Sequence, residues 1–371
     1  MTTNGTGLDG VVAGETALSS ISAGGELRYR GYAIGELAEN ATFEEVAYLL
    51  LHGRLPSTNE VNSFRAMLKA QRVLPAPLRR VLEQLPPTTH PMDVLRTGCS
   101  TLGCLEPEGT GHPPLAIACR LMAALPSILL YWHAFTTSLM RIDTSGTEET
   151  TAGHFLNMLL DKKPDPLHQH ALDASLTLYA EHLFNPSTFA ARTIASTQAD
   201  FYSAITGAIG ALRGPLHGGA NTAAIALVER YASPDEAEAG VLATLGTQER
   251  VPGFGHPLYQ AADPRSVAIK GWAAKLAAGS DDGARLMAVA ERIEAVMQRE
   301  RKVWPNVDFY SAIVYRLCGI PAPMFTPVFA FARIAGWSAH LMEQRTGNRV
   351  FWPASTYVGP EARPTPTLDQ R

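Results

Sequence analysis

Helical hydrophobic periodicity, broken at intervals by glycine and proline, runs through nearly all of this chain. Apolar residues recur every three or four positions, whereas almost no stretch alternates apolar and polar residues over a useful length. The pattern predicts an all-α fold with small β pieces near the two termini. Residues 27–32 are the candidate short strand or hairpin.

Local signals predict individual helices. Thr42 followed by Glu45 forms a capping-box pattern before an apolar run. Farther along, the periodicity predicts helices over 168–183 and 188–211. With 371 residues, the chain is long enough for two domains or for one large domain with an insertion.

The most apolar segment, 115–140, predicts a long helix interrupted near Pro126. Its core, 121–135, follows Arg120 and falls short of the roughly 20 residues that a membrane span needs. We therefore expect a buried helix and no membrane association. The formal net charge of −4 also argues against nucleic acid as a partner.

The four cysteines show neither a CxxC pair nor the spacing of metal ligands. They are Cys99, Cys104, Cys119 and Cys318. Their surroundings predict buried free thiols, which suit a reducing cytoplasm. Residues 1–5 lack the charged-then-apolar start of a signal peptide, so we expect a cytoplasmic protein, and we expect no metal site.

A glycine-rich octet, GPLHGGAN at 214–221, separates two helical runs and holds His217 near its centre. The glycines allow the backbone to approach a ligand closely. The first N–H groups of the next helix are open to an anion or oxyanion, and the positive helix end favours a neutral imidazole. The alternative is a plain helix–helix turn with an incidental histidine.

Two more segments have residue types suited to chemistry. The run VPGFGHP at 251–257 is too rich in glycine and proline for a regular element, so it either presents His256 and its backbone to a ligand or is an ordinary surface loop. In 304–310, Asp308 begins an apolar helix among aromatic residues. It is either an N-cap or a partly desolvated carboxylate basic enough to take a proton from carbon.

Two polar residues stand in apolar helical surroundings. His182 is either a hydrogen-bonded core histidine or a ligand-binding residue. Arg333 carries more information, because a buried guanidinium is costly unless it meets an anion or a paired carboxylate.

Taken in order, these motifs resemble those of the citrate synthase family. The matching stretches are 178–182, 214–221, 252–257 and 305–308. Further stretches over nearly the whole chain resemble the 2-methylcitrate synthase branch, namely 7–17, 29–32, 43–50, 90–98 and 368–371. Four separate motifs in one order make the resemblance specific.

The resemblance implies an enzyme that condenses acetyl-CoA or propionyl-CoA with oxaloacetate or a related 2-oxo acid. The resemblance also implies that this condensation is a reaction of the tricarboxylic acid cycle or of the methylcitrate cycle. Asp308 would remove the α-proton, His217 would hydrogen-bond the thioester oxygen, and His256 would protonate the ketone oxygen. Thioester hydrolysis would drive the reaction. The acyl-CoA is a substrate, and the resemblance implies no permanently bound cofactor and no metal.

The resemblance also implies binding residues. Oxaloacetate would be held by His182, Arg265 and Arg333, since guanidinium groups suit carboxylates. CoA would be bound by the backbone of Val251, Pro252, Gly253, Phe254 and Gly255, with Asn306 and Arg301 nearby.

The implied architecture is a homodimer of two-domain subunits with shared active sites. The large domain would comprise 1–219 and 321–371, and the small domain 220–320. Closure of the domains on the 2-oxo acid would assemble the site and exclude water.

The chain departs from the family near its C-terminus. Members carry an arginine before a proline there, which reaches the neighbouring subunit's site and binds a carboxylate of oxaloacetate, whereas this chain has Trp352. Leu183 likewise stands where a glutamate is usual. Either Arg349 substitutes, or the 2-oxo acid is non-standard, or the chain has lost efficient turnover. The different-class alternative is a non-catalytic CoA-binding regulatory paralogue.

Overall fold

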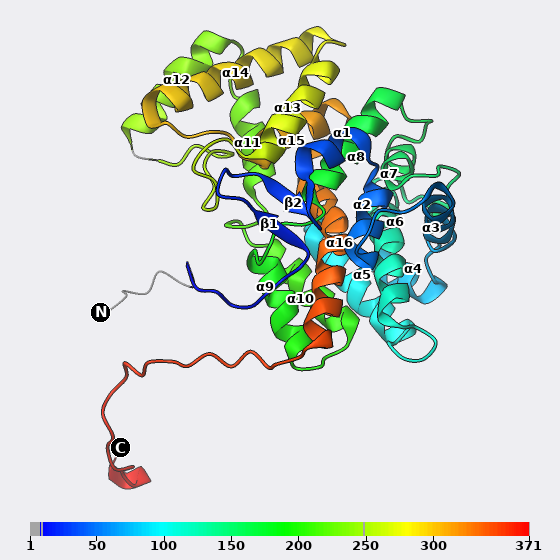
Figure 1. Ribbon diagram of the computed structural model, residues 1–371, viewed down its shortest axis with the longest axis vertical. Helices are drawn as coiled ribbons and strands as arrows, with labels where there is room; N and C mark the ends of the chain where they lie inside the picture. Colours follow the sequence, from blue (N-terminus) through cyan, green and yellow to red (C-terminus); the bar gives the residue numbers. More distant parts are fainter. Residues whose placement is uncertain (1–7, 9, 248, 371) are drawn as a thin grey trace.

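The computed structural model describes residues 8, 10–247 and 249–370, a part of the chain that forms sixteen α-helices and one small sheet (Figure 1). The helices are α1 (Ile34–Asn40), α2 (Phe43–His52), α3 (Thr58–Ala70), α4 (Ala76–Glu83), α5 (Pro91–Leu105), α6 (Pro114–Ser138), α7 (Thr151–Leu160), α8 (Pro166–Tyr179), α9 (Pro186–Ser196), α10 (Phe201–Leu212), α11 (Ala220–Glu229), α12 (Pro234–Gly246), α13 (Pro264–Ala277), α14 (Asp281–Arg301), α15 (Val307–Leu317) and α16 (Phe325–Thr346). The prediction of an all-α fold is confirmed.

The strands are confined to the N-terminal side of the described chain. They are β1 (Ser19–Ile21), β2 (Leu27–Tyr29) and β3 (Tyr32–Ala33), antiparallel in that order. Arg30 and Gly31 both have positive φ, as a two-residue hairpin turn requires, so the predicted hairpin at 27–32 is confirmed. The expected β piece near the C-terminus was wrong. There the chain leaves the body of the protein, has no strand to pair with, and ends in the 3₁₀ helix η2 (Leu368–Gln370) (Figure 1).

Two predicted helices were too long. The segment 188–211 is divided into α9 and α10, because Gln198 has positive φ and Asp200 caps α10 by accepting a hydrogen bond from the Ser203 amide. The segment 168–183 stops being helical after Tyr179. The capping box at the start of α2 is confirmed.

Helix α6 is continuous through Pro126, contrary to the predicted interruption. It packs against α3, α4, α5, α7 and α16, and this burial outweighs the one backbone hydrogen bond that proline removes. Of the helices in the described chain, α6 alone is long and apolar enough to cross a membrane, but 83% of its apolar stretch is buried inside the fold. It is therefore a core helix here.

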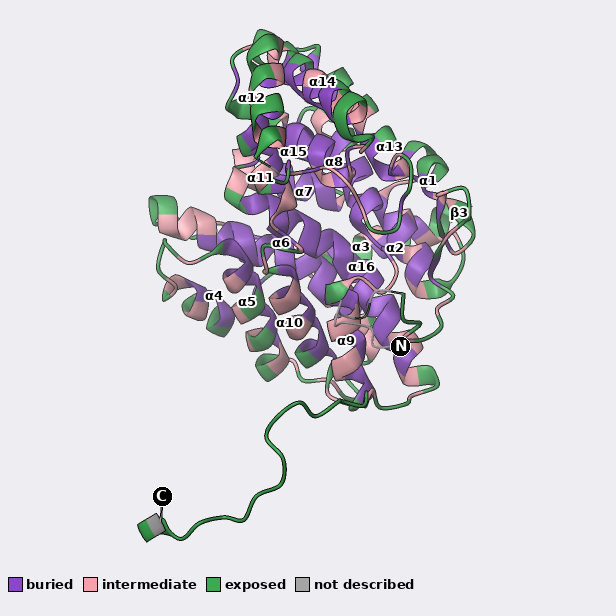
Figure 2. Ribbon diagram, turned by 90° about the vertical axis from the view of Figure 1, so that its left-hand side faces the viewer, coloured by how far each residue is buried: buried purple, intermediate pink, exposed green. Residues whose placement is uncertain are grey.

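Helix α16 runs through the middle of the protein and is buried over most of its length (Figures 1 and 2). It contacts α2, α6, α8, α9, α10 and α11, so its side chains touch most of the other layers. Helices α11 to α15 pack mainly on one another and form one end of the molecule, with α12 and α14 outermost (Figure 1). The two-domain boundaries at 219/220 and 320/321 stay a prediction.

All four cysteines are free, but Cys104 is exposed, which corrects the expectation of four buried thiols. It faces out from α5, whereas the other three point into the core. The signal-peptide prediction at residues 1–5 concerns residues outside those described. The motifs at 7–17 and 368–371 also lie partly outside the described residues.

A buried histidine in α7 should make the stability of the fold decrease at acidic pH. His154 accepts or donates one hydrogen bond, to Ser127 Oγ at 3.3 Å, and its Nδ1 has no partner. Burial, reinforced by Arg72, lowers the pKa of His154 to about 3. Because the unfolded chain takes up a proton below about pH 6.5 and the folded chain does not, this group's stabilisation falls as pH falls from about 6.5 toward 3.

We expect His154→Gln to reduce this loss. Between pH 7 and pH 5, the free energy of unfolding of the wild type should fall by about 2 kcal/mol more than that of the variant, at about 1.4 kcal/mol per pH unit. Urea denaturation at the two pH values measures the difference. The exposed His112→Gln serves as the matched control. Equal losses in wild type and His154→Gln would contradict the prediction.

Candidate active site

Six residues predicted from the sequence lie close together where the ends of α8, α11, α13 and α15 approach the middle of α16. They are His182, His217, His256, Arg265, Asp308 and Arg333. The ring centroids of His182 and His256 are 4.9 Å apart. Phe329 of α16 lies between two of the others, with its ring 6.0 Å from the His217 ring and 4.7 Å from the Arg333 guanidinium. Segments far apart in sequence therefore form one polar site.

The octet at 214–221 forms a tight turn between α10 and α11. The amides of His217 and Gly218 both donate to the carbonyl of Gly214. A side chain at Gly218 would overlap the carbonyl oxygen of Leu212, so glycine is required there by close backbone approach. The turn holds the His217 ring against Ser187, whose Oγ lies 2.8 Å from Nε2.

The backbone fixes the tautomer of His217. The amide N–H of Ser187 points at Nε2, with the two nitrogens 3.4 Å apart, and an amide can only donate. Nε2 is therefore the acceptor, and Nδ1 carries the proton of the neutral ring. Burial, reinforced by Arg333, lowers the pKa of His217 to about 4. At neutral pH the residue is an uncharged hydrogen-bond donor through Nδ1.

His256 is held in the opposite tautomer by the same kind of contact. The amide of Leu258 donates to Nδ1 at 3.1 Å, so the proton of the neutral ring is on Nε2. Burial, reinforced by the positive charge of Arg265, lowers the pKa of His256 to about 4. The site thus contains two neutral histidines whose donor atoms are set by main-chain amides.

The loop at 251–256 is joined by hydrogen bonds to the segment that precedes α15. The Gly255 amide donates to the Trp304 carbonyl at 3.0 Å, and the Asn306 amide donates to the Gly253 carbonyl at 2.9 Å. Asn306 Nδ2 also donates to the Gly255 carbonyl at 3.1 Å. A cavity of about 200 Å³ opens beside this junction. It is lined by Gly255, His256, Tyr259, Gln260, Ala261, Asp263, Lys302, Val303, Trp304, Pro305 and Asn306.

His182 is positioned by the turn that follows α8. Leu183 has φ of +53°, so the chain reverses immediately after the histidine. The His182 carbonyl accepts a hydrogen bond from Asn185 Nδ2 at 3.2 Å, and its ring nitrogen Nε2 lies 2.8 Å from Tyr259 Oη. Burial, followed by the charge of Arg265, holds the pKa of His182 well below its usual range.

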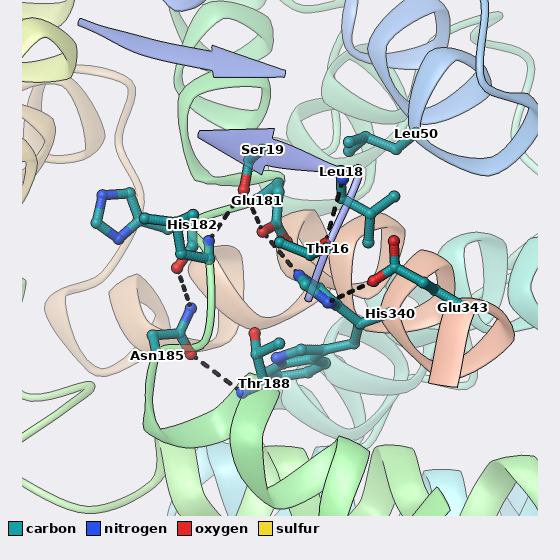
Figure 3. Close-up of polar contacts among 12 residues, drawn as sticks. Thr16, Leu18, Ser19, Leu50, Glu181, His182, Asn185, Thr188, His340 and Glu343 are labelled. Atoms are coloured by element: carbon teal, nitrogen blue, oxygen red, sulfur yellow. Dashed lines mark hydrogen bonds and ion pairs between the residues drawn. The ribbon is translucent and has the colours of Figure 1, made fainter. Parts of the chain in front are cut away.

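Beside His182, the buried Glu181 connects the sheet to α16 (Figure 3). Its Oε1 accepts hydrogen bonds from Ser19 Oγ at 2.9 Å and from His340 Nε2 at 2.8 Å. Ser19 Oγ in turn accepts the Leu183 amide at 3.2 Å. Tyr29 Oη donates to the Glu181 carbonyl at 2.6 Å. The turn that carries His182 is therefore held from two strands and a helix.

Arg192 sets the hydrogen-bond roles of the two ring nitrogens of His340. Arg192 Nη1 lies 2.9 Å from His340 Nδ1, and because a guanidinium can only donate, Nδ1 is the acceptor. The ring proton is then on Nε2, which donates a hydrogen bond to Glu181 Oε1. Arg192 also pairs with Glu343 at 2.6 Å, and Glu343 Oε1 accepts the Ala17 amide at 2.8 Å. The network thus extends from the N-terminal segment to the residue beside His182.

Ser19→Ala tests this support. The change leaves the Leu183 amide without an acceptor and removes one donor from the buried Glu181, so we expect the free energy of unfolding to fall by about 1–3 kcal/mol. Urea denaturation measures it. Ser20→Ala, one position along the same strand but exposed, should unfold at the wild-type midpoint. Equal midpoints for the two variants would refute the assigned role.

Arg265 and Arg333 supply buried positive charge. Arg265 is paired with Asp263, the N-cap of α13, through Nε–Oδ1 at 3.1 Å and Nη2–Oδ2 at 2.8 Å. Burial alone would lower the pKa of Arg265, but the carboxylate of Asp263 raises it above the usual value. Asp263 also accepts the Val307 amide at 3.2 Å, so it ties α13 to the start of α15.

Arg333 is the less compensated cation. Its Nε donates to the Tyr179 carbonyl at 2.5 Å, but its buried Nη1 has no hydrogen-bond partner. Burial lowers the pKa of Arg333 to about 10, against the opposing charge of Glu181. An unpaired, buried guanidinium nitrogen beside three histidines is suited to an anionic ligand.

Asp308 lies in the first turn of α15 but does not cap it. The N-cap is Asn306, whose Oδ1 accepts the Asp308 amide at 3.1 Å, so the simpler reading of Asp308 as a cap was wrong. The carboxylate accepts a hydrogen bond from Tyr179 Oη at 2.6 Å. Burial raises the pKa of Asp308, while Tyr179 and then Arg265 act in the opposite direction.

Three residues expected at the site are not brought to it within this chain. Trp352 is 89% exposed, and Arg349 is also exposed, both on the C-terminal segment that leaves the body (Figures 1 and 2). Arg301 is exposed at the end of α14 and donates to the Leu245 carbonyl at 2.8 Å.

Four residues that hold the site together were not assigned a role from the sequence. They are Tyr179, Ser187, Tyr259 and Asp263. Asp263 had a usable signal, because it precedes Pro264 at a helix start. The others act across 30 or more residues of chain, which no local pattern reports. Among the described residues, no group of three or more His, Cys, Asp or Glu side chains is arranged to hold a metal ion.

Comparison with known proteins identifies the family of this chain. The model of the "citrate synthase, C-terminal domain" family matches residues 7–354. The chain is 49% identical to a 2-methylcitrate synthase of Shewanella oneidensis, over 97% of this chain and 96% of that one. It is 38% identical to a citrate synthase of Synechocystis, over 95% of this chain and 90% of that one.

Solved structures show the same fold. Citrate synthase of Thermotoga maritima superposes with a TM-score of 0.87 at 33% identity, covering 99% of each chain. Citrate synthase of Thermoplasma acidophilum, in a ternary complex with carboxymethyl coenzyme A and oxaloacetate, gives a TM-score of 0.91 at 29% identity, again covering 99% of each chain. The chain belongs to the citrate synthase family and is a condensing enzyme of the transferase class.

Proposed function

We propose that this enzyme condenses acetyl-CoA or propionyl-CoA with oxaloacetate or a related 2-oxo acid and then hydrolyses the thioester, releasing CoA. One observation carries the proposal. Asp308, a carboxylate of raised pKa, lies in one site with two neutral histidines, His217 and His256, and two buried arginines. This is the set of groups that enolisation followed by attack on a ketone requires.

In the first step, Asp308 takes a proton from the α-carbon of the acyl-CoA. Negative charge develops on the thioester oxygen, and the Nδ1–H of His217 donates to it. A neutral imidazole suits this task, because its pKa of about 4 keeps it uncharged at pH 7 while it still donates a hydrogen bond.

In the second step, the enol carbon attacks the ketone carbon of the 2-oxo acid. The Nε2–H of His256 donates to the ketone oxygen, which becomes the hydroxyl of the product. Arg265, Arg333 and His182 hold the carboxylates of the 2-oxo acid; the unpaired Nη1 of Arg333 supports this role. Water then cleaves the new thioester, giving the free acid and CoA.

The CoA moiety is assigned to the loop at 251–255 and to Asn306. Their hydrogen-bonded junction and the adjoining cavity of about 200 Å³ support this assignment. Arg301 lies at the end of α14, shortly before Asn306 in the chain, and would face the phosphates of CoA. The separate packing of α11 to α15 supports a small domain at 220–320 that closes on the rest.

We further infer a homodimer with shared sites in the cytoplasm. Asn348 and Phe351 still contact α9, and beyond them the C-terminal segment leaves the body of its own chain (Figure 2). Several apolar residues of this segment are exposed. These are Val350, Trp352, Tyr357, Val358 and Leu368. An extended apolar arm of this kind is stabilised by packing on a second copy, which would bring Trp352 to the partner's site.

Trp352 favours a second candidate substrate, a 2-oxo acid whose far end is less polar than a carboxylate. An indole at the position where the family has an arginine removes one charge-assisted contact to that end of the substrate. Arg349, three residues earlier, is the alternative source of the missing charge. A regulatory paralogue without catalysis is disfavoured, because the three chemical groups are all present.

CoA release, followed with a thiol reagent, tests the proposal. Purified enzyme is assayed with acetyl-CoA and propionyl-CoA against oxaloacetate, 2-oxoglutarate, 2-oxobutyrate and glyoxylate. Release with at least one pair is expected. If oxaloacetate is used with ordinary efficiency, the second candidate is wrong, and if no pair releases CoA, the enzyme proposal is wrong.

A further inference from the structure

Two buried side chains, from α11 and α8, form a hydrogen-bonded line that ends on the half-buried Asp308 of α15. Asn221 Nδ2 of α11 lies 2.7 Å from Tyr179 Oη of α8, and Tyr179 Oη lies 2.6 Å from Asp308 Oδ1 of α15. Asn221 is fully buried, and Tyr179 is 1% exposed. Asn221 is also the last residue of the glycine-rich octet, and the reaction steps above give it no part.

The direction of this line follows from the chemistry of its members. An ionised carboxylate only accepts, so the single hydroxyl proton of Tyr179 points at Asp308. The hydroxyl oxygen must then accept from Asn221, which fixes the amide with Nδ2 toward the tyrosine. The other atom of that amide, Oδ1, is buried without a partner. The orientation of the Asn221 amide that donates to the tyrosine thus leaves its own oxygen unpaired.

The line leaves the two oxygens of Asp308 unequal. Oδ1 is occupied by the tyrosine, whereas Oδ2 has no hydrogen-bond donor within the described part of the chain. Oδ2 is therefore the oxygen on which no lone pair is taken by a hydrogen bond. The same contact opposes the desolvation that raises the pKa of this carboxyl.

We propose that Tyr179 is a positioning residue that selects Oδ2 of Asp308 as the basic atom, and that Asn221 keeps the tyrosine hydroxyl pointing at the carboxylate. This inference rests on the proposed function, because it assumes that Asp308 is the base. The other groups whose charges act at this carboxylate are Arg265, Asp263 and Arg333, and Tyr315 of α15 faces it as well. None of them donates a hydrogen bond to it in the described chain.

Tyr179→Phe tests the proposal by removing one oxygen atom. The carboxyl of Asp308 loses its donor, so its pKa rises. We expect the acid limb of the kcat/KM profile to move up by about one pH unit, and kcat at pH 7 to fall about 10-fold, with KM for acyl-CoA within twofold of wild type. The matched control is Tyr315→Phe, since the hydroxyl of Tyr315 pairs with Ser175 at 2.7 Å and not with Asp308. Its pH profile should match the wild type.

Asn221→Asp tests the direction of the line with an isosteric change. A carboxylate at this position accepts the tyrosine proton and turns it away from Asp308, so the pH profile should move in the same direction as in Tyr179→Phe. In Tyr179→Phe, adding Asn221→Ala should cause no further shift, because the amide acts through the hydroxyl. Circular dichroism and thermal melting establish that each variant is folded.

The outcomes separate the two proposals. If wild-type enzyme releases no CoA with any substrate pair, the proposed function fails. If it is active but Tyr179→Phe keeps the wild-type profile and kcat, Tyr179 does not position the base. If Tyr179→Phe shifts the profile and folded Asn221→Asp does not, Asn221 does not orient the hydroxyl. If the Tyr179→Phe protein does not fold, the pH profile of Asn221→Asp becomes the test. An unshifted profile in that variant contradicts the proposed roles of both Tyr179 and Asn221.

Discussion

Asp308→Asn should reduce the rate of CoA release by about 10³-fold or more while leaving acyl-CoA binding within a few-fold of wild type. The change removes the carboxylate proposed to take the α-proton, and general-base catalysis is worth about 10²–10⁴-fold. The asparagine keeps the shape and can still accept from Tyr179 at the position of Oδ1. Steady-state CoA release and calorimetric titration of acyl-CoA measure the two quantities.

Two controls make the result specific. Exchange of the α-protons of the acyl-CoA with deuterated solvent should be lost in the same variant, since it reports the first step alone. Asp282→Asn, an exposed aspartate at the start of α14, should leave both rates unchanged. CoA release within twofold of wild type in Asp308→Asn would eliminate Asp308 as the base and with it the mechanism proposed above.

Trp352→Arg should change the preference of the enzyme among 2-oxo acids. A guanidinium at this position adds a charge-assisted contact to a distal carboxylate, and such a buried contact is worth about 2–5 kcal/mol. We expect the ratio of kcat/KM for oxaloacetate to that for 2-oxobutyrate to rise about 30-fold or more, since 1.4 kcal/mol is a factor of ten. KM for acyl-CoA should change little.

Mixed dimers show whether this effect crosses the subunit interface. In a heterodimer of Trp352→Arg with Asp308→Asn, the proposed sharing of sites would carry the tail of the first chain to the site of the second. The intact site would then keep its tryptophan and the wild-type preference. The double variant in one chain, mixed with wild type, should instead show the arginine preference at the wild-type site. Arg349→Gln serves as the comparison for the alternative source of charge. An unchanged substrate ratio in Trp352→Arg would place residue 352 outside the site.

Local chemistry is what made the helices predictable. The capping box at Thr42 and Glu45, for example, acts within four residues and has the same effect in any fold. The failures had two physical causes, packing by distant elements at Pro126 and a local cap at Asp200. Pro126 does not interrupt α6, because neighbouring helices cover it on several sides. The predicted helix at 188–211 breaks at Gln198 and Asp200, where capping ends one helix and starts another.

The sequence by itself determined the helical class, the motifs and the residue types of the site, because these depend on spacing along the chain. Only the tertiary structure decided the state of those residues. The proton of His217 sits on Nδ1 because a Ser187 amide occupies Nε2, and the proton of His256 sits on Nε2 because the Leu258 amide occupies Nδ1. Burial, which no single segment encodes, sets the pKa values, since desolvation depends on what every other element places around a group.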